Sequence, residues 1–434
     1  SIALGVLLSA GLTLSYALSP QAFAASVGEG FGRELRVGSV ALELVPWPRI
    51  RVEAVAIEDL GSARAAEVEL HFAPLLHRQV RARSVRLIEP HLVLHRGPDG
   101  DFLPLFRGRG EPRSEPAALP TFEAEGGEIR VVQGEKLTAV VRLASLSLGG
   151  FDAEGGADLV LTGNVTGGDG RWHAHPLRLR ARLVHGAERT VLRDGRARAQ
   201  HVGASWWRGD HAHARFRYED GRILLDRLEV RAFGGAWRAE GRVRLRGGMR
   251  LDLAARADGV SLAELAAAST PGSRPGDLGT LDVRFHRLVV PWRGGPRWEE
   301  GRGRGELRLS GGVLRGRSLL ASVLGAEPAP NAVASLRAAV ELRDGRLHSE
   351  DVRLDTADYV LDTRGSVGLD RSLALEGFAT LVGAPDVPVT IGGSLGRPAV
   401  DAHPSRLPGN RIGAIASGVT KTGAGAGRVI GATD

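Results

Sequence analysis

The chain lacks cysteine and has little lysine, methionine or aromatic content. No Cys occurs among its 434 residues, which excludes disulfide bonds, thiol catalysis and zinc–thiolate sites. The absence of disulfides is compatible with any redox compartment. Of the 57 basic residues only Lys136 and Lys421 are lysines, Met249 is the single methionine, and aromatic residues make up 5% of the chain. Together with an excess of Ala and Gly, the preference for arginine is typical of GC-rich codon usage.

The chain also lacks a run of like charge, although its formal net charge is +7 at pH 7. The arginines are spread along the sequence, and acidic residues are interleaved with them. Nucleic-acid binding normally requires a basic patch or a known module. We therefore expect no nucleic-acid partner.

An uncharged apolar stretch occupies residues 2–18. Its 17 residues are at the short end for a membrane span, although a helix can continue through residues 22–25. Residues 22–24, Ala-Phe-Ala, also fit a signal-peptidase site, so a cleaved signal is the alternative to an anchor. We favour the anchor, and in both cases the remainder is exported. The apolar side chains expected in the anchor are Ile2, Leu4, Val6, Leu7, Leu8, Leu12, Leu14 and Leu18.

From residue 35 onward, apolar and polar residues alternate with a period of two, as in residues 68–72, 177–183 and 281–285. Successive side chains of a strand point to opposite faces. This alternation is typical of an antiparallel sheet with one side kept from water. Residues expected to face water include Arg178, Arg180, Arg182 and Arg284. Residues expected to face inward and line a groove are Val68, Leu70, Phe72, Leu179, Val283, Phe285, Leu307 and Leu309.

Asp-Gly-Arg recurs at residues 169–171, 194–196, 220–222 and 344–346, each time between alternating runs. Asp-Gly suits a tight hairpin because both central residues adopt positive φ readily. The repeated hairpins predict a meander with few helices. One short helix is expected at residues 261–268, with Ser261 as its N-cap and Glu264 at the capping-box position.

The predicted fold is mainly β: an extended, curled antiparallel sheet that forms an apolar-lined groove or half-barrel. One N-terminal transmembrane helix and a few short helices complete it. Some 20–25 strands spaced ~4.8 Å apart would make a ribbon ~100 Å long. The predicted parts are an anchor helix (1–24), an N-terminal β module (25–106), a linker or loop (107–120), a middle β meander (121–270), a C-terminal β module (271–405) and a Gly/Ala-rich tail (406–434).

Few motifs suggest chemistry. Residues 392–396 match the G-x-S-x-G nucleophile pattern, but Arg397 and Pro398 follow where that chemistry requires a helix. Residues 173–175 and 211–213 each place two histidines on one strand face, and no further ligand is evident for a metal. We expect no catalytic, metal or cofactor site and no enzymatic activity.

The segment at residues 32–48, with Gly-Arg at its start and Pro-Trp-Pro at its end, resembles the start of AsmA-family proteins. Residues 51–57, 74–78 and 85–92 extend the resemblance to about residue 105. Residues 305–324 and 387–398 resemble the C-terminal repeat and closing strand of the family. The middle, from about 121 to 260, is similar to the family only in its general sequence character and carries none of these motifs.

The resemblance implies a protein of a Gram-negative-type envelope, anchored in the inner membrane with its body in the periplasm. It implies an apolar-lined β groove linked to phospholipid traffic toward the outer membrane and to outer-membrane assembly. The leading hypothesis is therefore a non-enzymatic protein that binds or conducts phospholipid. The alternatives are a scaffold or assembly factor for outer-membrane or other envelope proteins and, if the signal is cleaved, a secreted β protein.

Overall fold

The computed structural model divides the chain into two compact units. Unit 1 comprises Ser1–Val230 and Arg244–Gly247, and unit 2 comprises Arg231–Val243 and Gly248–Asp434. The structure describes residues 19–21, 24, 34–43, 47–71, 82–97, 120–149, 156–185, 190–204, 207–246, 248–269, 278–293, 296–314, 331–356, 359–381, 386–394 and 397–402. The predicted anchor residues, Phe72 and the 406–434 tail lie outside these ranges.

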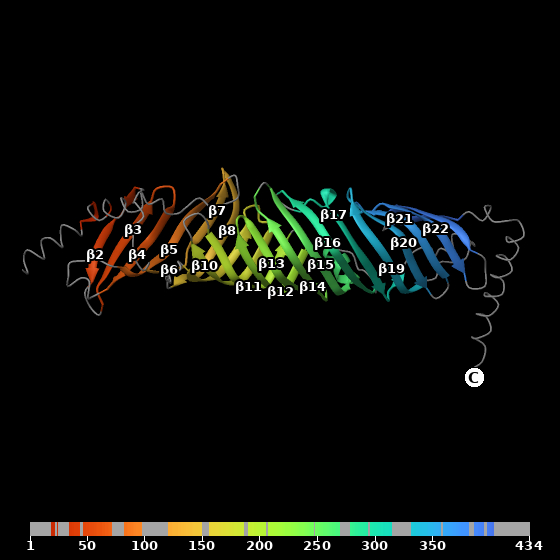
Figure 1. Ribbon diagram of the computed structural model, residues 1–434, viewed down its shortest axis with the longest axis horizontal. Coiled ribbons are helices and arrows are strands. Elements are labelled where there is room, and N and C mark those ends of the chain that lie inside the picture. The colour runs from red at the N-terminus through yellow and green to blue at the C-terminus, as the bar shows by residue number, and fades with distance from the viewer. Residues whose placement is uncertain are drawn as a thin grey trace, which may run out of the picture. The chain divides into compact units, whose positions relative to one another are not determined.

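Unit 1 is built from strands (Figure 1). Its described strands are β1 (Leu35–Arg36), β2 (Ser39–Glu43), β3 (Arg49–Ile57), β4 (Gly61–Leu70), β5 (Ala82–Arg96), β6 (Thr121–Glu125), β7 (Glu128–Gln133), β8 (Lys136–Gly149), β9 (Gly156–Gly167), β10 (Trp172–His185), β11 (Thr190–Ala204), β12 (Trp207–Glu219) and β13 (Arg222–Ala232), the last of which ends in unit 2.

Unit 2 is also mainly β. Its described elements are β14 (Gly235–Arg244), β15 (Met249–Ser261), α4 (Leu262–Ser269), β16 (Thr280–Trp292), the 3-10 helix η1 (Trp298–Glu300), β17 (Arg302–Ser310), β18 (Val313–Leu314), β19 (Asn331–Arg343), β20 (Arg346–Thr356), β21 (Tyr359–Gly368), β22 (Leu373–Leu381), β23 (Val387–Ser394) and β24 (Arg397–Ala402).

Strands that follow one another along the chain pair antiparallel in both units, for example β3 with β4 and β21 with β22. The exception is β5, which pairs parallel with β6 and with β7. Parallel neighbours require a crossover connection of a dozen or more residues, and the segment between β5 and β6 is long enough to provide it. The prediction of a mainly β, curled antiparallel sheet is confirmed apart from this local exception (Figure 1).

Residues with positive φ and bulges interrupt the ladders of unit 1. Ala54 on β3, Glu89 on β5 and His211 on β12 have φ values of 51°, 49° and 52°, and at each the ladder skips one pair while its register stays the same. The register shifts at Asp194 on β11, opposite both β10 and β12. Gly126 and Gly127, with φ of 69° and 85°, separate β6 from β7. A bulge bends its strand and increases the local twist, so the shift at Asp194 favours a curled sheet.

Unit 2 has the same feature. The register between β16 and β17 shifts at His286, and that between β19 and β20 shifts at Val340. Gly241 and Gly365 take φ values of 139° and 140°, which a residue with a Cβ rarely adopts. Curvature is therefore built into the strands themselves.

The buried side chains form small clusters within each unit rather than one large core. In unit 1 the clusters are Val52, Val55, Ala63 and Ala66, and Ala124, Ile129 and Leu143. In unit 2 one cluster comprises Leu354, Tyr359, Leu361, Ala379, Val389 and Ile391.

The predicted turns are correct at three of the four tight Asp-Gly sites. Asp169-Gly170 lies between β9 and β10, with positive φ at Gly170. Asp220-Gly221 and Asp344-Gly345 join β12 to β13 and β19 to β20, and all four residues have positive φ, as a type I′ hairpin requires. The hairpin predicted at Asp194 is wrong, because this residue lies inside β11. With φ of 50° it forms a bulge opposite β10 and β12.

The predicted short helix is confirmed as α4. Its N-cap is Ser261, whose Oγ accepts a hydrogen bond from the backbone N–H of Glu264 at 3.3 Å. A helix of this kind satisfies one of its free N–H groups with a side-chain oxygen. None of the helices in the described ranges is long and apolar enough to span a bilayer.

Candidate functional site

The predicted groove residues of unit 2 lie together on one face of neighbouring strands. Val283 on β16 is directly opposite Leu307 on β17, and Phe285 is opposite Gly305. Leu309 lies two residues beyond Leu307 on the same face. The four apolar side chains are half-buried. We call this surface the apolar face of unit 2, and its role as a groove stays a prediction.

Phe285 lies flat along this face. A Cβ added to Gly305 would lie 2.9 Å from Phe285 Cδ1, and one added to Gly303 would lie 3.3 Å from the same atom. The ring therefore occupies the space that the two glycines leave open. An aromatic ring placed over a strand glycine compensates for its missing side chain. Phe285 thus contacts the backbone of β17 from the apolar face.

In unit 1 the predicted residues lie on two separate strands. Leu70 on β4 is buried, with 6% of its surface exposed, whereas Val68 is half-buried. Leu179 on β10 is half-buried and lies opposite Leu161 on β9 and Ala197 on β11. The sheet therefore brings none of these three side chains into direct register with one another.

Large apolar side chains are buried at some places in the described sheet and not at others. Leu342, Tyr359 and Leu361 are 3%, 4% and 5% exposed. Leu179, Phe285 and Leu307 instead stay half-buried, and the described helices are too short and few to form a second layer over them.

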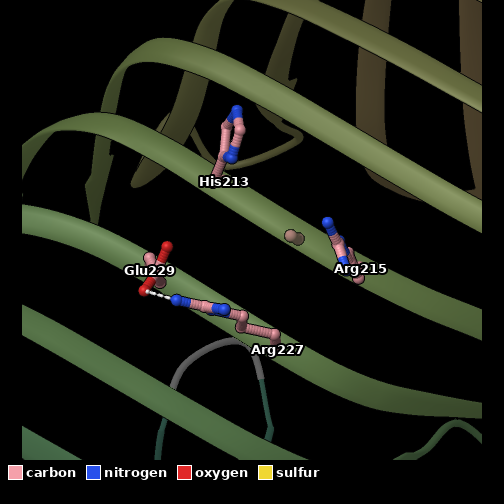
Figure 2. A pocket seen from close by; sticks show the side chains of 5 residues that line it. His213, Arg215, Arg227 and Glu229 are labelled. Atoms are coloured by element: carbon pink, nitrogen blue, oxygen red, sulfur yellow. Dashed lines mark hydrogen bonds and ion pairs between the residues drawn. The ribbon is translucent and has the colours of Figure 1, made fainter.

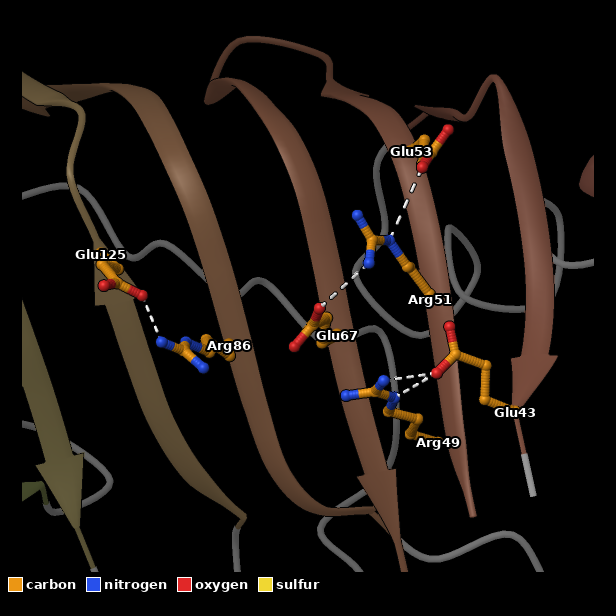
Figure 3. Close-up of polar contacts among 7 residues, drawn as sticks. All are labelled: Glu43, Arg49, Arg51, Glu53, Glu67, Arg86 and Glu125. Carbon is orange, nitrogen blue, oxygen red and sulfur yellow. Dashed lines mark hydrogen bonds and ion pairs between the residues drawn. The ribbon is translucent and has the colours of Figure 1, made fainter. Parts of the chain in front are cut away.

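The polar face of β2–β6 is neutralised by ion pairs (Figure 3). Arg49 Nε donates to Glu43 Oε2 at 2.6 Å, and this hydrogen bond, followed by the charge of Glu43, raises the pKa of Arg49. A hydrogen bond to Glu125 raises the pKa of Arg86 in the same way. Arg51 lies between two carboxylates, 3.6 Å from Glu53 and 3.7 Å from Glu67. Exposed pairs of this kind contribute little stability, but they leave little net charge on this face.

The polar face of β10–β12 is different, because arginines there face one another across the strands. Arg178 is directly opposite Arg198, Arg180 is opposite Arg196, and Arg196 is opposite Arg215. All five side chains are exposed, and none makes a hydrogen bond or ion pair within the described ranges. We call these five residues the arginine grid. Sequence reasoning missed it because the arginines are far apart along the chain, although their alternation on three successive strands was a visible signal.

A small pocket lies beside the grid (Figure 2). Its lining comprises His213, Ala214, Arg215, Arg227 and Glu229, and its volume is about 140 Å³. Arg227 Nη2 donates to Glu229 Oε1 at 2.5 Å along β13, on one side of the pocket. Ligand sites for small molecules typically measure roughly 300–1,000 Å³ and are mostly apolar. The pocket therefore does not suit an acyl chain.

Histidines gather on the same face without forming a metal site. The rings of His173 and His175 stack with centroids 5.1 Å apart, and His201 lies 5.4 Å from His175. His201 Nδ1 is 2.8 Å from an oxygen of Asp210. Across the described ranges, no group of three or more His, Asp or Glu residues is arranged to hold a metal ion.

The G-x-S-x-G match lies in a hairpin. Ser394 ends β23, Arg397 begins β24, and the two residues are paired in the antiparallel ladder. A nucleophile elbow instead requires a strand followed by a helix. Ser394 therefore lacks the strand-to-helix turn that would expose its hydroxyl as a nucleophile.

No family model, curated protein or solved structure matches the chain. The AsmA resemblance thus rests on the sequence motifs alone.

Proposed function

We propose that the chain is a non-enzymatic envelope protein that binds or conducts phospholipid along the apolar faces of its curled sheet. In this proposal residues 2–18 anchor it in the inner membrane and the β units lie in the periplasm. Acyl chains lie against the apolar side chains, and headgroups remain in water. The protein then supports lipid homeostasis and assembly of the outer membrane.

The observation that carries the proposal is a group of large apolar side chains that stay incompletely buried. Val283, Phe285, Leu307 and Leu309 are neighbours on one face and half-buried, whereas Leu342, Tyr359 and Leu361 in the same unit are buried. A large apolar surface of a soluble domain is normally covered by protein or occupied by a ligand. An acyl chain is a ligand that suits an extended aliphatic surface without polar groups.

The bulges add a second argument. They bend the strands within each unit, at Asp194 in unit 1 and at His286 in unit 2. A bent sheet has a concave side, which shields an elongated apolar ligand from water better than a flat sheet does. The location in the envelope is supported by the apolar N-terminal segment and by the AsmA-like motifs.

The test is photocrosslinking in cells with benzoylphenylalanine at Leu307, with the same probe at Arg308 as the matched control. The two residues are adjacent on β17 and point to opposite faces. A second apolar position, Leu179 on β10, extends the test to unit 1. We expect phospholipid adducts at Leu307 and Leu179 and none at Arg308.

Two results would contradict the proposal. Equal adducts at Leu307 and Arg308 would indicate non-specific contact with membranes. Adducts with protein alone at Leu307 and Leu179, in a folded chain, would favour a scaffold for outer-membrane or other envelope proteins.

A further inference from the structure

The arginine grid places like charges directly opposite one another on three strands. Such cross-strand pairs are unfavourable, and the grid contains three of them, Arg178–Arg198, Arg180–Arg196 and Arg196–Arg215. Within the described ranges no carboxylate pairs with any of the five side chains. The repulsion therefore has no compensating partner inside the described chain.

The other end of unit 1 provides an internal comparison. On β3–β7, glutamate partners are present for Arg49, Arg51, Arg64, Arg86 and Arg130, for example Glu89 at 3.2 Å from Arg64 and Glu128 at 2.6 Å from Arg130. The same alternating sequence pattern thus yields a neutralised surface in one place and an unpaired basic surface in the other. The contrast points to a ligand with several negative charges at β10–β12.

The spacing of the grid suits an array of phosphates. Neighbouring strands lie about 4.8 Å apart, and alternate residues of a strand lie about 6.7 Å apart. Arg178 and Arg180 therefore form one row with Arg198 and Arg196 beside them. The guanidinium group binds phosphate in a bidentate manner and, when it is not otherwise paired, is free to do so.

We propose that the arginine grid docks the protein on an anionic phospholipid membrane surface. The grid presents several positive charges spread over an area of the sheet. A layer of anionic lipid headgroups presents several negative charges over an area in the same way, so the two surfaces are complementary in charge. The grid contains no Phe, Tyr or Trp on which nucleic-acid bases would stack. The apolar stretch at residues 2–18 also points to a membrane near this chain. This docking is additional to the proposed function, because it uses the polar face and does not require lipid on the apolar face.

The experiment uses the full chain held in nanodiscs of neutral phosphatidylcholine, so that the apolar N-terminal segment is already accommodated. Binding is measured to immobilised vesicles of phosphatidylcholine alone or mixed with phosphatidylglycerol. The test variant combines Arg178→Gln, Arg180→Gln, Arg196→Gln and Arg198→Gln. The matched control combines Arg49→Gln, Arg64→Gln, Arg86→Gln and Arg130→Gln, which removes the same charge from the ion-paired face.

We expect the parent chain to bind the anionic vesicles and not the neutral ones. The test variant should lose about 100-fold in affinity, because each arginine near an anionic surface contributes severalfold. The control should lose far less. Thermal unfolding should show the test variant to be at least as stable as the parent, since its changes remove like-charge pairs.

Equal losses in the two variants would overturn the proposal, because net charge alone would then explain the binding. Binding that does not depend on phosphatidylglycerol would overturn it too. Tighter binding to a duplex oligonucleotide than to the anionic vesicles, abolished in the test variant, would assign the grid to nucleic acid instead. None of these results alters the outcome of crosslinking at Leu307, which lies in unit 2.

Discussion

Gly305 shows how a single missing side chain controls the packing of two strands. A Cβ at this position would lie 2.2 Å from the backbone oxygen of Arg284 and 2.9 Å from Phe285 Cδ1. The first contact is with backbone, which cannot move without disturbing the ladder between β16 and β17. The glycine therefore allows both the close strand pairing and the flat position of the Phe285 ring.

Gly305→Ala should lower the free energy of unfolding by about 1–3 kcal/mol, because extra volume at a close-packed site forces the backbone to shift. Gly392→Ala is the matched control, since a Cβ there would meet nothing within 4 Å, and its effect should stay within about 0.5 kcal/mol. Denaturant unfolding of both variants measures the difference. Equal stabilities would show that β17 adjusts to the extra methyl group.

At this scale the sequence predicted which way side chains point, but not which ones meet. Alternation alone indicated that Arg178 and Arg180 face water, and both are exposed, whereas Leu179 between them is half-buried. The pairing of Arg180 with Arg196 depends on the register of β10 and β11, which includes a shift between Arg180 and Arg182. A shift of register has no signature in the spacing of charges, so the alternation of arginines along each strand could not show which of them lie opposite one another.

At the scale of the strand, a residue with positive φ decides which residues share a face. Val52 and Val55 are three residues apart, and strict alternation would place them on opposite faces. Both belong to the same buried cluster, and Ala54, with φ of 51°, lies between them. The register with β4 is the same on both sides of Ala54, with Val52 opposite Ala66 and Val55 opposite Ala63. The change of face is therefore made by the backbone conformation at Ala54.

Ala54→Val tests this role. A β-branched residue rarely adopts positive φ, so the substitution either strains this position or returns it to ordinary extended backbone. The second outcome would turn Val55 and Ile57 to the opposite face, and losing the burial of one valine alone costs about 1.5–3 kcal/mol. We expect more rapid proteolysis of the β3–β4 hairpin in Ala54→Val. Ala54→Gly accepts positive φ more readily, so it should be as resistant as the parent. Equal resistance of Ala54→Val would mean that positive φ at this position does not set the faces.

The same chemistry explains the wrong turn prediction. Asp-Gly forms a hairpin at Asp344-Gly345 and a bulge at Asp194-Gly195, because both structures use positive φ at the aspartate. What distinguishes them is tertiary: Gly195 lies against the ring of Phe216 on β12, with a Cβ there 2.8 Å from ring atoms. The parallel pairing of β5 with β6 could not be predicted from the sequence either. The predicted linker gives the length of the connection after β5, but it does not show beside which strand the chain continues.

At the scale of the molecule, burial is divided among several small clusters rather than one large enclosed core. In unit 1 the cluster around Val52 consists of Val and Ala side chains, whereas in unit 2 Leu354, Tyr359, Leu361 and Ile391 are buried together. Phe285 and Leu307 on the apolar face of unit 2 are half-buried and belong to neither cluster, so they are available for another role. Mainly β character was predictable from alternation, whereas the use of the apolar face was not, because alternation is the same for a covered core and a lipid-bearing surface.

A charge placed on the apolar face of unit 2 separates folding from lipid binding. Leu307 is half-buried, so Leu307→Glu should leave the chain folded, with the free energy of unfolding lowered by about 1–3 kcal/mol. A carboxylate there would repel an acyl chain, because leaving water for a hydrocarbon environment is costly for a charge. We expect severalfold less phospholipid to copurify with this variant, as measured by mass spectrometry per mole of protein.

Arg308→Glu is the control, since Arg308 is exposed on the other face opposite Arg337 and Asp282. It should keep the parental amount of phospholipid, and an unchanged amount in Leu307→Glu as well would exclude this face as the lipid-binding surface.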